Sequence, residues 1–362
     1  MVAGGGRRDA GIQNEPMADV ERPQPRRWPT LAGIAAPVLA VAIVALVSSR
    51  GHSEPPPTPL PTATPAPTDE LPIVSKSLVA SDPRSGDLVL VGCCGPAAGG
   101  AEPASTWVWT RSGWTHLDPA TAPPFHPGAA FAFDPSTATF LLQGGEATSD
   151  TWSWDGRTWT RLEPRATPPS GPAVMTYDPV DHTLVLLTGA PGADVETWRW
   201  DGRTWTPIPA PLPSPGPFAL AADPVRGLLV LVAGGGCAVD GPSQTWTFDG
   251  HSWSPVPGPP CDPSTQLGWD PVSRNVVAVL LGDSAYPLRM SAQPATIWQW
   301  STAGWSQVLT ESAPEETGRF VADGVDPAVF VSDRRTGGRP DLWLWTAPGW
   351  ERHPGGRGVP GR

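Results

Sequence analysis

A set of acidic residues, with one arginine beside them, recurs just after short apolar segments of this sequence. Carboxylates accept hydrogen bonds from ligand hydroxyls and bind cations, and arginine donates to carboxylates and phosphates. The set therefore predicts a site for a cation or a polar ligand, with a solvated rim as the alternative. No pair has a spacing that defines a catalytic pair, so no catalytic residue is assigned. The set is Glu146, Asp194, Glu196, Asp240, Asp283, Asp333 and Arg334.

Histidine and cysteine supply little further chemistry. His116, His126, His182, His251 and His353 are scattered singly, so neither a zinc site nor a cofactor is predicted. The four cysteines are expected to be oxidised outside the cytoplasm. We predict a disulfide between the cysteines at positions 237 and 261, closing a loop of about 25 residues and stabilising by about 3 kcal/mol. The pairing of the remaining two stays open, since adjacent cysteines can bond to each other or elsewhere. The four are Cys93, Cys94, Cys237 and Cys261.

Tryptophan reveals the elements that must position these residues. The chain has 19 Trp, and 17 of them fall in six copies of one phrase, aromatic-x-aromatic followed five residues later by Trp. Side chains two apart point to the same side of a strand, where large aromatics fill the wedge between neighbouring sheets. Six copies of a four-stranded unit predict an all-β, six-bladed propeller. The copies begin at 106–109, 151–154, 197–200, 245–248, 297–300 and 342–345.

One copy can be divided into its four strands. Residues 129–133 and 139–143 are apolar segments joined by a turn at Asp134-Pro135, which favours the first two turn positions. Residues 151–154 and 159–162 follow, joined by a turn at Asp155-Gly156. The sixth copy is degenerate, with Asp323-Gly324 at its first turn. Because every copy runs from its first strand to its fourth, the ring is expected to close by packing copy six against copy one.

Strand direction separates two faces of the predicted ring. The connections after the second and fourth strands of each copy open on one face, and the tight turns open on the other. The first face has the longer loops, such as 282–295 and 234–244. Long loops on a rigid scaffold are where function usually lies, so this face is predicted to carry the binding site. Trp269, outside the repeated phrase, is a separate candidate for a sugar-stacking platform.

The N-terminal part predicts a membrane address. Residues 28–49 are free of charge and long enough for a bilayer at about 1.5 Å per residue. Arginines precede them, which places the arm 1–27 in the cytoplasm and the rest outside, as a single-pass membrane protein. A cleaved signal peptide is the alternative. Residues 50–70 are rich in Pro and Thr and predict an extended stalk that holds the propeller, residues 71–362, away from the membrane.

The repeated phrase resembles the bacterial kelch-repeat family, which shares its propeller with the central domain of galactose-oxidase-like enzymes. The resemblance covers residues 77–352 and rests on Gly144-Gly145, Gly234-Gly235 and the Trp-x-Trp/Phe-Asp-Gly segments. Three copies reduce the glycine pair to one Gly and the sixth has Ser332-Asp333 in its place, which are departures from the family. The oxidase needs two Tyr at its copper, and the only candidates here are Tyr177 and Tyr286. The resemblance therefore implies a binding module rather than a copper enzyme.

These observations lead to one expectation with two alternatives. The formal net charge of −11 excludes a phosphate-binding surface for nucleic acid, and the scarcity of Lys against Arg is typical of a GC-rich bacterial genome. We expect a membrane-anchored, extracytoplasmic, monomeric propeller that binds an envelope protein or a glycan without catalysis. A hydrolase or lyase that uses the loop face, and a sensor ectodomain, are the alternatives.

Overall fold

The computed structural model describes residues 77–92, 103–110, 113–189, 194–212, 218–233, 242–260, 262–281, 295–310, 312–314, 318–322, 328–332, 341–346 and 349–354. All of them belong to the second of two units, residues 55–362. Among these described residues, no helix is long and apolar enough to cross a membrane. The predicted arm 1–27, span 28–49 and stalk 50–70 lie outside the described residues.

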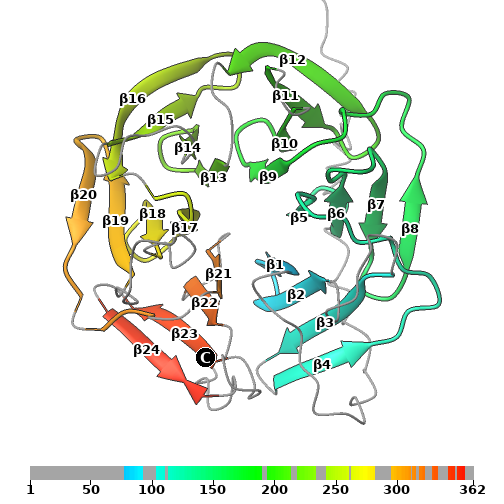
Figure 1. Cartoon of the computed structure of the whole chain (residues 1–362), viewed down its shortest axis with the longest axis horizontal. Helices are drawn as coiled ribbons and strands as arrows, with labels where there is room; N and C mark the ends of the chain where they lie inside the picture. Colours follow the sequence, from blue (N-terminus) through cyan, green and yellow to red (C-terminus); the bar gives the residue numbers. More distant parts are fainter. Residues whose placement is uncertain are drawn as a thin grey trace, which may run out of the picture. The chain divides into compact units, whose positions relative to one another are not determined.

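The described residues form six antiparallel sheets of four consecutive strands each, arranged as blades around a ring (Figure 1). The first strand of each blade lies innermost and the fourth lies at the rim, which confirms the predicted six-bladed propeller. Blade one is β1 (Ser77–Asp82), β2 (Asp87–Gly92), β3 (Ser105–Thr110) and β4 (Gly113–Leu117); blade two is β5 (Ala130–Asp134), β6 (Thr139–Gln143), β7 (Thr151–Trp154) and β8 (Trp159–Leu162); blade three is β9 (Ala173–Asp178), β10 (Thr183–Thr188), β11 (Val195–Trp200) and β12 (Trp205–Leu212).

The other three blades repeat this order with small differences in length. The first strand of blade six has four residues, against six in the first strand of blade four. Blade four is β13 (Phe218–Asp223), β14 (Leu228–Ala233), β15 (Pro242–Phe248) and β16 (Trp253–Pro260); blade five is β17 (Gln266–Asp270), β18 (Asn275–Leu280), β19 (Thr296–Ser301) and β20 (Gly304–Val308); blade six is β21 (Gly318–Val321), β22 (Ala328–Ser332), β23 (Asp341–Thr346) and β24 (Gly349–His353).

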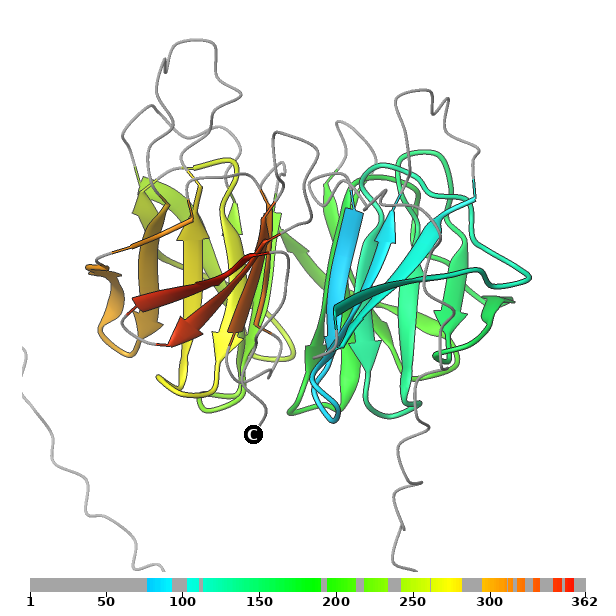
Figure 2. The same ribbon diagram turned by 90° about the horizontal axis from the view of Figure 1, so that it is seen from below.

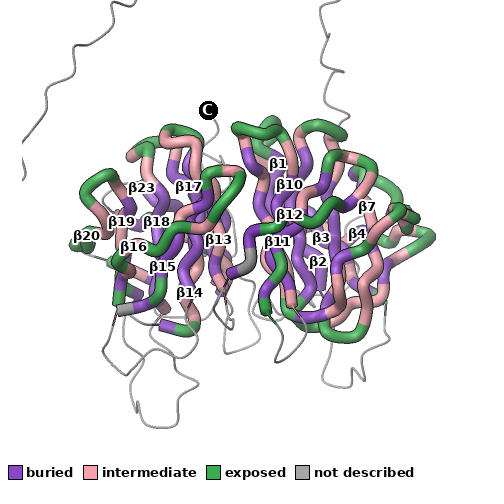
Figure 3. The backbone as a smooth tube through the Cα atoms, turned by 90° about the horizontal axis from the view of Figure 1, so that it is seen from above, coloured by how far each residue is buried: buried purple, intermediate pink, exposed green. Residues whose placement is uncertain are grey.

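The second strand of each blade is the centre of the core. Leu184, Val185, Leu186 and Leu187 of β10 are all fully buried, because both faces of the strand pack against neighbouring blades. A strand buried on both faces reads as a continuous apolar run, as these segments do. The tube coloured by burial shows buried strands inside the ring and exposed turns along both edges (Figure 3).

Buried aspartates shape the tight turns between the first and second strands. The Oδ1 atom of Asp134 accepts a hydrogen bond from the backbone N–H of Ser136 at 2.9 Å, and Asp178 accepts one from Val180 at the same distance. The last turn residue is left-handed, with φ of 58° at Ala138. We name the edge that carries these turns, at 83–86, 135–138, 179–182, 224–227 and 271–274, the turn face; the opposite edge is the loop face. The β1–β2 turn lies at the lower edge in Figure 2.

Blade six meets blade one through side chains. Leu88 and Leu90 of β2 share one buried cluster with Val329 and Val331 of β22. The Nε atom of Arg319 in β21 also donates to the backbone oxygen of Ser77 at 2.9 Å. Each described sheet contains only strands of its own blade, so closure by packing is confirmed. The segment 71–74, a possible closing strand, lies outside the described residues.

Candidate functional site

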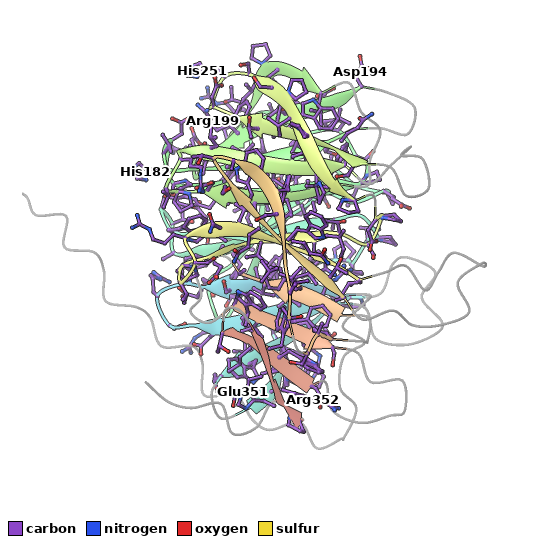
Figure 4. The ribbon with its side chains drawn as sticks, turned by 90° about the vertical axis from the view of Figure 1, so that its left-hand side faces the viewer. His182, Asp194, Arg199, His251, Glu351 and Arg352 are labelled. Atoms are coloured by element: carbon purple, nitrogen blue, oxygen red, sulfur yellow. The ribbon has the colours of Figure 1, made fainter. Side chains whose placement is uncertain are left out.

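The structure describes three of the seven predicted ligand-binding residues. Glu146 is exposed after β6, and Asp194 is exposed just before β11. Glu196, exposed in β11, accepts a hydrogen bond from the indole N–H of Trp198 at 2.9 Å. Asp194 lies at the edge of the ring opposite His182 and His251, on the loop face (Figure 4). The other four lie outside the described residues, and they are Asp240, Asp283, Asp333 and Arg334.

Two other predictions depend on residues that the structure does not describe. Cys93, Cys94, Cys237 and Cys261 are outside the described ranges, so the disulfide between positions 237 and 261 stays a prediction. Within the described ranges, no three His, Cys, Asp or Glu side chains come together as metal ligands.

The loop-face ends of the outer strands carry a polar arrangement in blade two. Arg161 of β8 pairs with Asp150, just before β7, at 2.7 Å, and with Glu163 at 3.2 Å. Arg161 lies directly opposite Trp152 in the β7–β8 ladder. The guanidinium is half exposed, and the hydrogen bond that it donates to Asp150, followed by the charge of Asp150, raises the pKa of Arg161. A fixed carboxylate–guanidinium pair thus lies beside a partly buried indole.

Blade six repeats this arrangement. The Nε atom of Arg352 in β24 donates to the buried Asp341 at 2.9 Å, and its guanidinium lies 5.6 Å from the ring centroid of Trp343. In both blades the acid and the arginine are 11 residues apart and the indole follows the acid by two. Figure 4 shows Arg352 beside Glu351 at the outer end of blade six. We name the two groups, Asp150–Trp152–Arg161 and Asp341–Trp343–Arg352, the rim triads.

The rim triads were not among the predicted site residues. The sequence nevertheless contains a signal for them. Copies two and six alone have both an acid two residues before the first Trp of the phrase and an Arg nine residues after that Trp. Blade three has the acid, Glu196, but Pro207 stands where the Arg would be. The triads therefore belong to particular blades and not to the repeat itself.

The ring also holds a cavity at each end of its central channel. At the loop face a cavity of about 450 Å³ is lined by the first halves of the innermost strands, including Met175, Phe218 and Gln266. At the turn face a smaller cavity of about 220 Å³ is lined by residues from the ends of the same strands in blades one to five. Phe133, Tyr177 and Trp269 line this second cavity.

Comparison with known proteins shows the fold. No family model matches the chain, and no curated protein matches it. The lectin SapL1, solved with α-methyl fucoside, is 13% identical with a TM-score of 0.54, over 79% of this chain and 97% of the lectin. A variant of Aleuria aurantia lectin, solved with Fucα1-6GlcNAc, is 12% identical with a TM-score of 0.53, over 79% and 98%. AofleA from Arthrobotrys oligospora is 10% identical with a TM-score of 0.52, over 78% and 86%. The described part of the chain is thus a six-bladed, all-β propeller.

Proposed function

We propose that this chain is a non-catalytic, glycan-binding propeller of the kelch type, anchored in the cell membrane with its propeller outside. The observation that supports glycan binding is the pair of rim triads. Each presents a guanidinium held by a carboxylate beside an indole ring, once in blade two and once in blade six.

The chemistry of a rim triad suits a sugar. Sugar hydroxyls are both donors and acceptors, so the guanidinium of each triad can donate to them, and in blade two the partly exposed Asp150 can accept from them. The ion pair fixes the orientation of the arginine before the ligand arrives, which lowers the entropy lost on binding. The indole offers apolar surface for the C–H face of a sugar ring. Arg161 and Arg352 are about half exposed, with side-chain exposures of 52% and 42%, so a ligand can reach both.

The comparisons support this proposal at the level of the fold. SapL1 and the Aleuria aurantia lectin bear the same ring and were solved with fucosides. Fucosides are therefore the first glycans to test. The proposed kelch membership rests on the Gly144-Gly145 pair and on the Asp-Gly turns after the repeated Trp phrase.

The binding proposal is tested on a glycan array with the full-length protein in detergent. We expect saturable binding to at least one glycan, and at least a tenfold loss of affinity in Arg161→Ala and in Arg352→Lys. Lysine keeps the charge beside the buried Asp341 but not the planar fork of the guanidinium, so this variant avoids a buried unpaired carboxylate. Arg157→Ala is the matched control, because this exposed arginine lies in the β7–β8 turn on the other face. A full array without a ligand, or an unchanged affinity in both triad variants, would overturn the proposal.

The membrane address has a separate test. Residues 28–49 should hold the full-length chain in the membrane fraction, and a chain that lacks residues 1–49 should be released from it. Protease added to cells whose outer envelope layers are permeabilised while the cytoplasmic membrane stays intact should digest the propeller but not the arm 1–27. A full-length chain found in the soluble fraction would contradict the anchor while leaving the glycan proposal intact.

A further inference from the structure

The cavity at the turn face is built from one equivalent position in five blades. The residue that precedes the turn aspartate lines it in blades one to five, and Pro residues of the turns form its edge. Blades two, three and five place Phe133, Tyr177 and Trp269 at this position, whereas blades one and four place Ser81 and Ala222. Blades two and five lie across the ring from each other (Figure 1). Phe133 and Trp269 therefore line the cavity from opposite sides.

The size of the cavity fits a small molecule. An apolar cavity of about 150 Å³ holds benzene, and this one measures about 220 Å³. Phe133 and Trp269 are buried, with 5% and 9% of their surface exposed. Small residues at blades one and four leave the space that aromatic side chains at every blade would fill.

One buried polar residue belongs to the wall of this cavity. Ser81 lines the cavity and is fully buried. Within the part of the chain that the structure describes, its hydroxyl has no hydrogen-bond partner. Buried polar groups in native structures are almost always paired, because an unpaired one lowers stability. Ser81 is thus a residue of the cavity wall whose hydroxyl lacks a partner among the described residues.

The charge around the cavity is negative. The five turns at its mouth, residues 82–87, 134–139, 178–183, 223–228 and 270–275, contain seven Asp and three Arg. Arg84 pairs with Asp82 and Arg226 pairs with Asp223, each within its own turn, and Arg199 of β11 pairs with Asp181. The remaining buried carboxylates accept hydrogen bonds from N–H and O–H donors. Among the described residues these carboxylates have no cationic partner. These are Asp134, Asp178 and Asp270.

The charges around the cavity lie close to two of the aromatic residues that line it. The guanidinium of Arg84 already lies 4.8 Å from the ring centroid of Phe133 while it pairs with Asp82. The pKa of Tyr177 is raised first by burial and then by the charges of Asp134 and Asp178. Cations are attracted to aromatic faces, most strongly to Trp, and carboxylates add to that attraction.

We infer that the turn-face cavity binds a small organic cation, an alkylated ammonium with a hydroxyl or ether group. The ammonium would lie against Trp269 and Tyr177 within the field of the carboxylates, and the polar group would reach Ser81. This site lies on the opposite face from the rim triads and does not depend on glycan binding.

The test compares two isosteric probes by titration calorimetry on the full-length protein in detergent. Choline carries the cation, and 3,3-dimethylbutan-1-ol has the same shape with carbon in place of the charged nitrogen. We expect saturable binding of choline and at least tenfold weaker binding of the neutral alcohol. Equal affinity for the two probes, or no saturable binding of choline, would overturn the inference.

Variants locate the site. Ser81→Ala should weaken choline about three- to tenfold, whereas Ser85→Ala, an exposed serine in the next turn, should leave its affinity unchanged. Ala222→Phe fills the cavity from blade four and should abolish binding; should this variant fail to fold, Ser81→Ala still decides. Choline binding that Ser81→Ala leaves unchanged would overturn the assignment, and so would unchanged choline binding to a folded Ala222→Phe.

The source of the ammonium group has its own measurement. Phosphatidylcholine vesicles that displace choline would assign the ligand to a lipid headgroup. Vesicles without effect would assign it to a free solute, and both results support a cation site.

Discussion

Trp205 in β12 of blade three donates its indole N–H to the hydroxyl of Thr151 in β7 of blade two, at 3.1 Å. The same bond joins Trp159 to Thr106 at 2.9 Å and Trp253 to Thr197 at 3.0 Å. Thr is the first residue of the repeated phrase and this Trp is the last. The phrase therefore encodes a hydrogen bond between neighbouring blades as well as apolar filling.

The other three seams of the ring lack this bond. Thr245 and Trp305 occupy the equivalent positions between blades four and five, but both polar atoms are buried and have no partner among the described residues. Ile297 and Leu342 replace the threonine in blades five and six. The Trp–Thr bond thus joins blades one to four, whereas different hydrogen bonds cross two of the other seams, from Trp345 to Asp270 and from Arg319 to Ser77.

The first prediction compares two threonines in these seams. The Thr151 hydroxyl accepts from Trp205 and donates to Gln143 at 2.5 Å, so Thr151→Val strands both partners and should cost about 1–3 kcal/mol of unfolding free energy. Thr245→Val removes a hydroxyl that has no partner and should be neutral or slightly stabilising. Denaturant unfolding of both variants measures the difference, and equal effects would contradict the hydrogen-bond account.

Glycine at the seam between blades five and six supplies the second prediction. A Cβ at position 268 would lie 2.3 Å from the Cβ of Ala322, whereas one at Gly349 would meet nothing within 4 Å. Gly268→Ala should therefore force the blades apart and cost about 1–3 kcal/mol, as overpacked cores do. Gly349→Ala is the control and should unfold at a midpoint close to that of the parent protein. A Gly268→Ala variant as stable as this control would mean that blades five and six can move apart without loss of stability, against the prediction.

The strands of this fold were largely predictable because each repeat contains turn residues that mark where its strands end. In blade two, three of the four predicted strands agree with the observed bounds and the first differs by one residue. The fourth strands of blades three and four extend further than their Pro residues suggest, to Leu212 and Pro260. Pro cannot donate in a ladder, but an outermost strand needs donors on one side only, so Pro is tolerated there.

The sites were less predictable because they depend on which blades lie opposite each other. The position before each turn aspartate was visible in the sequence, and Trp269 was singled out as a sugar-stacking candidate. Its approach to Phe133 and Tyr177 at one cavity arises only when the ring closes. Loop length directed attention to the loop face, whereas the aromatic cavity lies at the turn face.

The third prediction concerns the alkaline titration of Tyr177. The pKa of Tyr177 in the folded state is raised above the ordinary value of 10.0. The folded state therefore favours the neutral phenol over the phenolate. This contribution to stability is present below pH 10 and is lost as the pH rises through the folded pKa. The chain has two Tyr, so Tyr286→Phe leaves the titration of Tyr177 alone in the phenolate absorbance. A midpoint above 10 is expected.

Two further variants check the cause of that shift. Asp134→Asn removes one of the charges that raise the pKa of Tyr177 and should lower the midpoint. Tyr177→Phe should remove this titration altogether. Circular dichroism at each pH must show that the propeller is still folded, and a midpoint at or below 10 in folded Tyr286→Phe would contradict the prediction.

The fourth prediction is the disulfide between Cys237 and Cys261. If the propeller lies outside the cytoplasm, the two thiols meet an oxidising environment, and the bridge would close a loop of about 25 residues. Cys237→Ser and Cys261→Ser should each lower the unfolding free energy by about 3 kcal/mol, and the double variant should cost no more than either single one. Mass spectrometry of unreduced peptides should recover the cross-linked pair. Independent, additive losses, or peptides in which either Cys is bonded to Cys93 or Cys94, would replace this pairing with another.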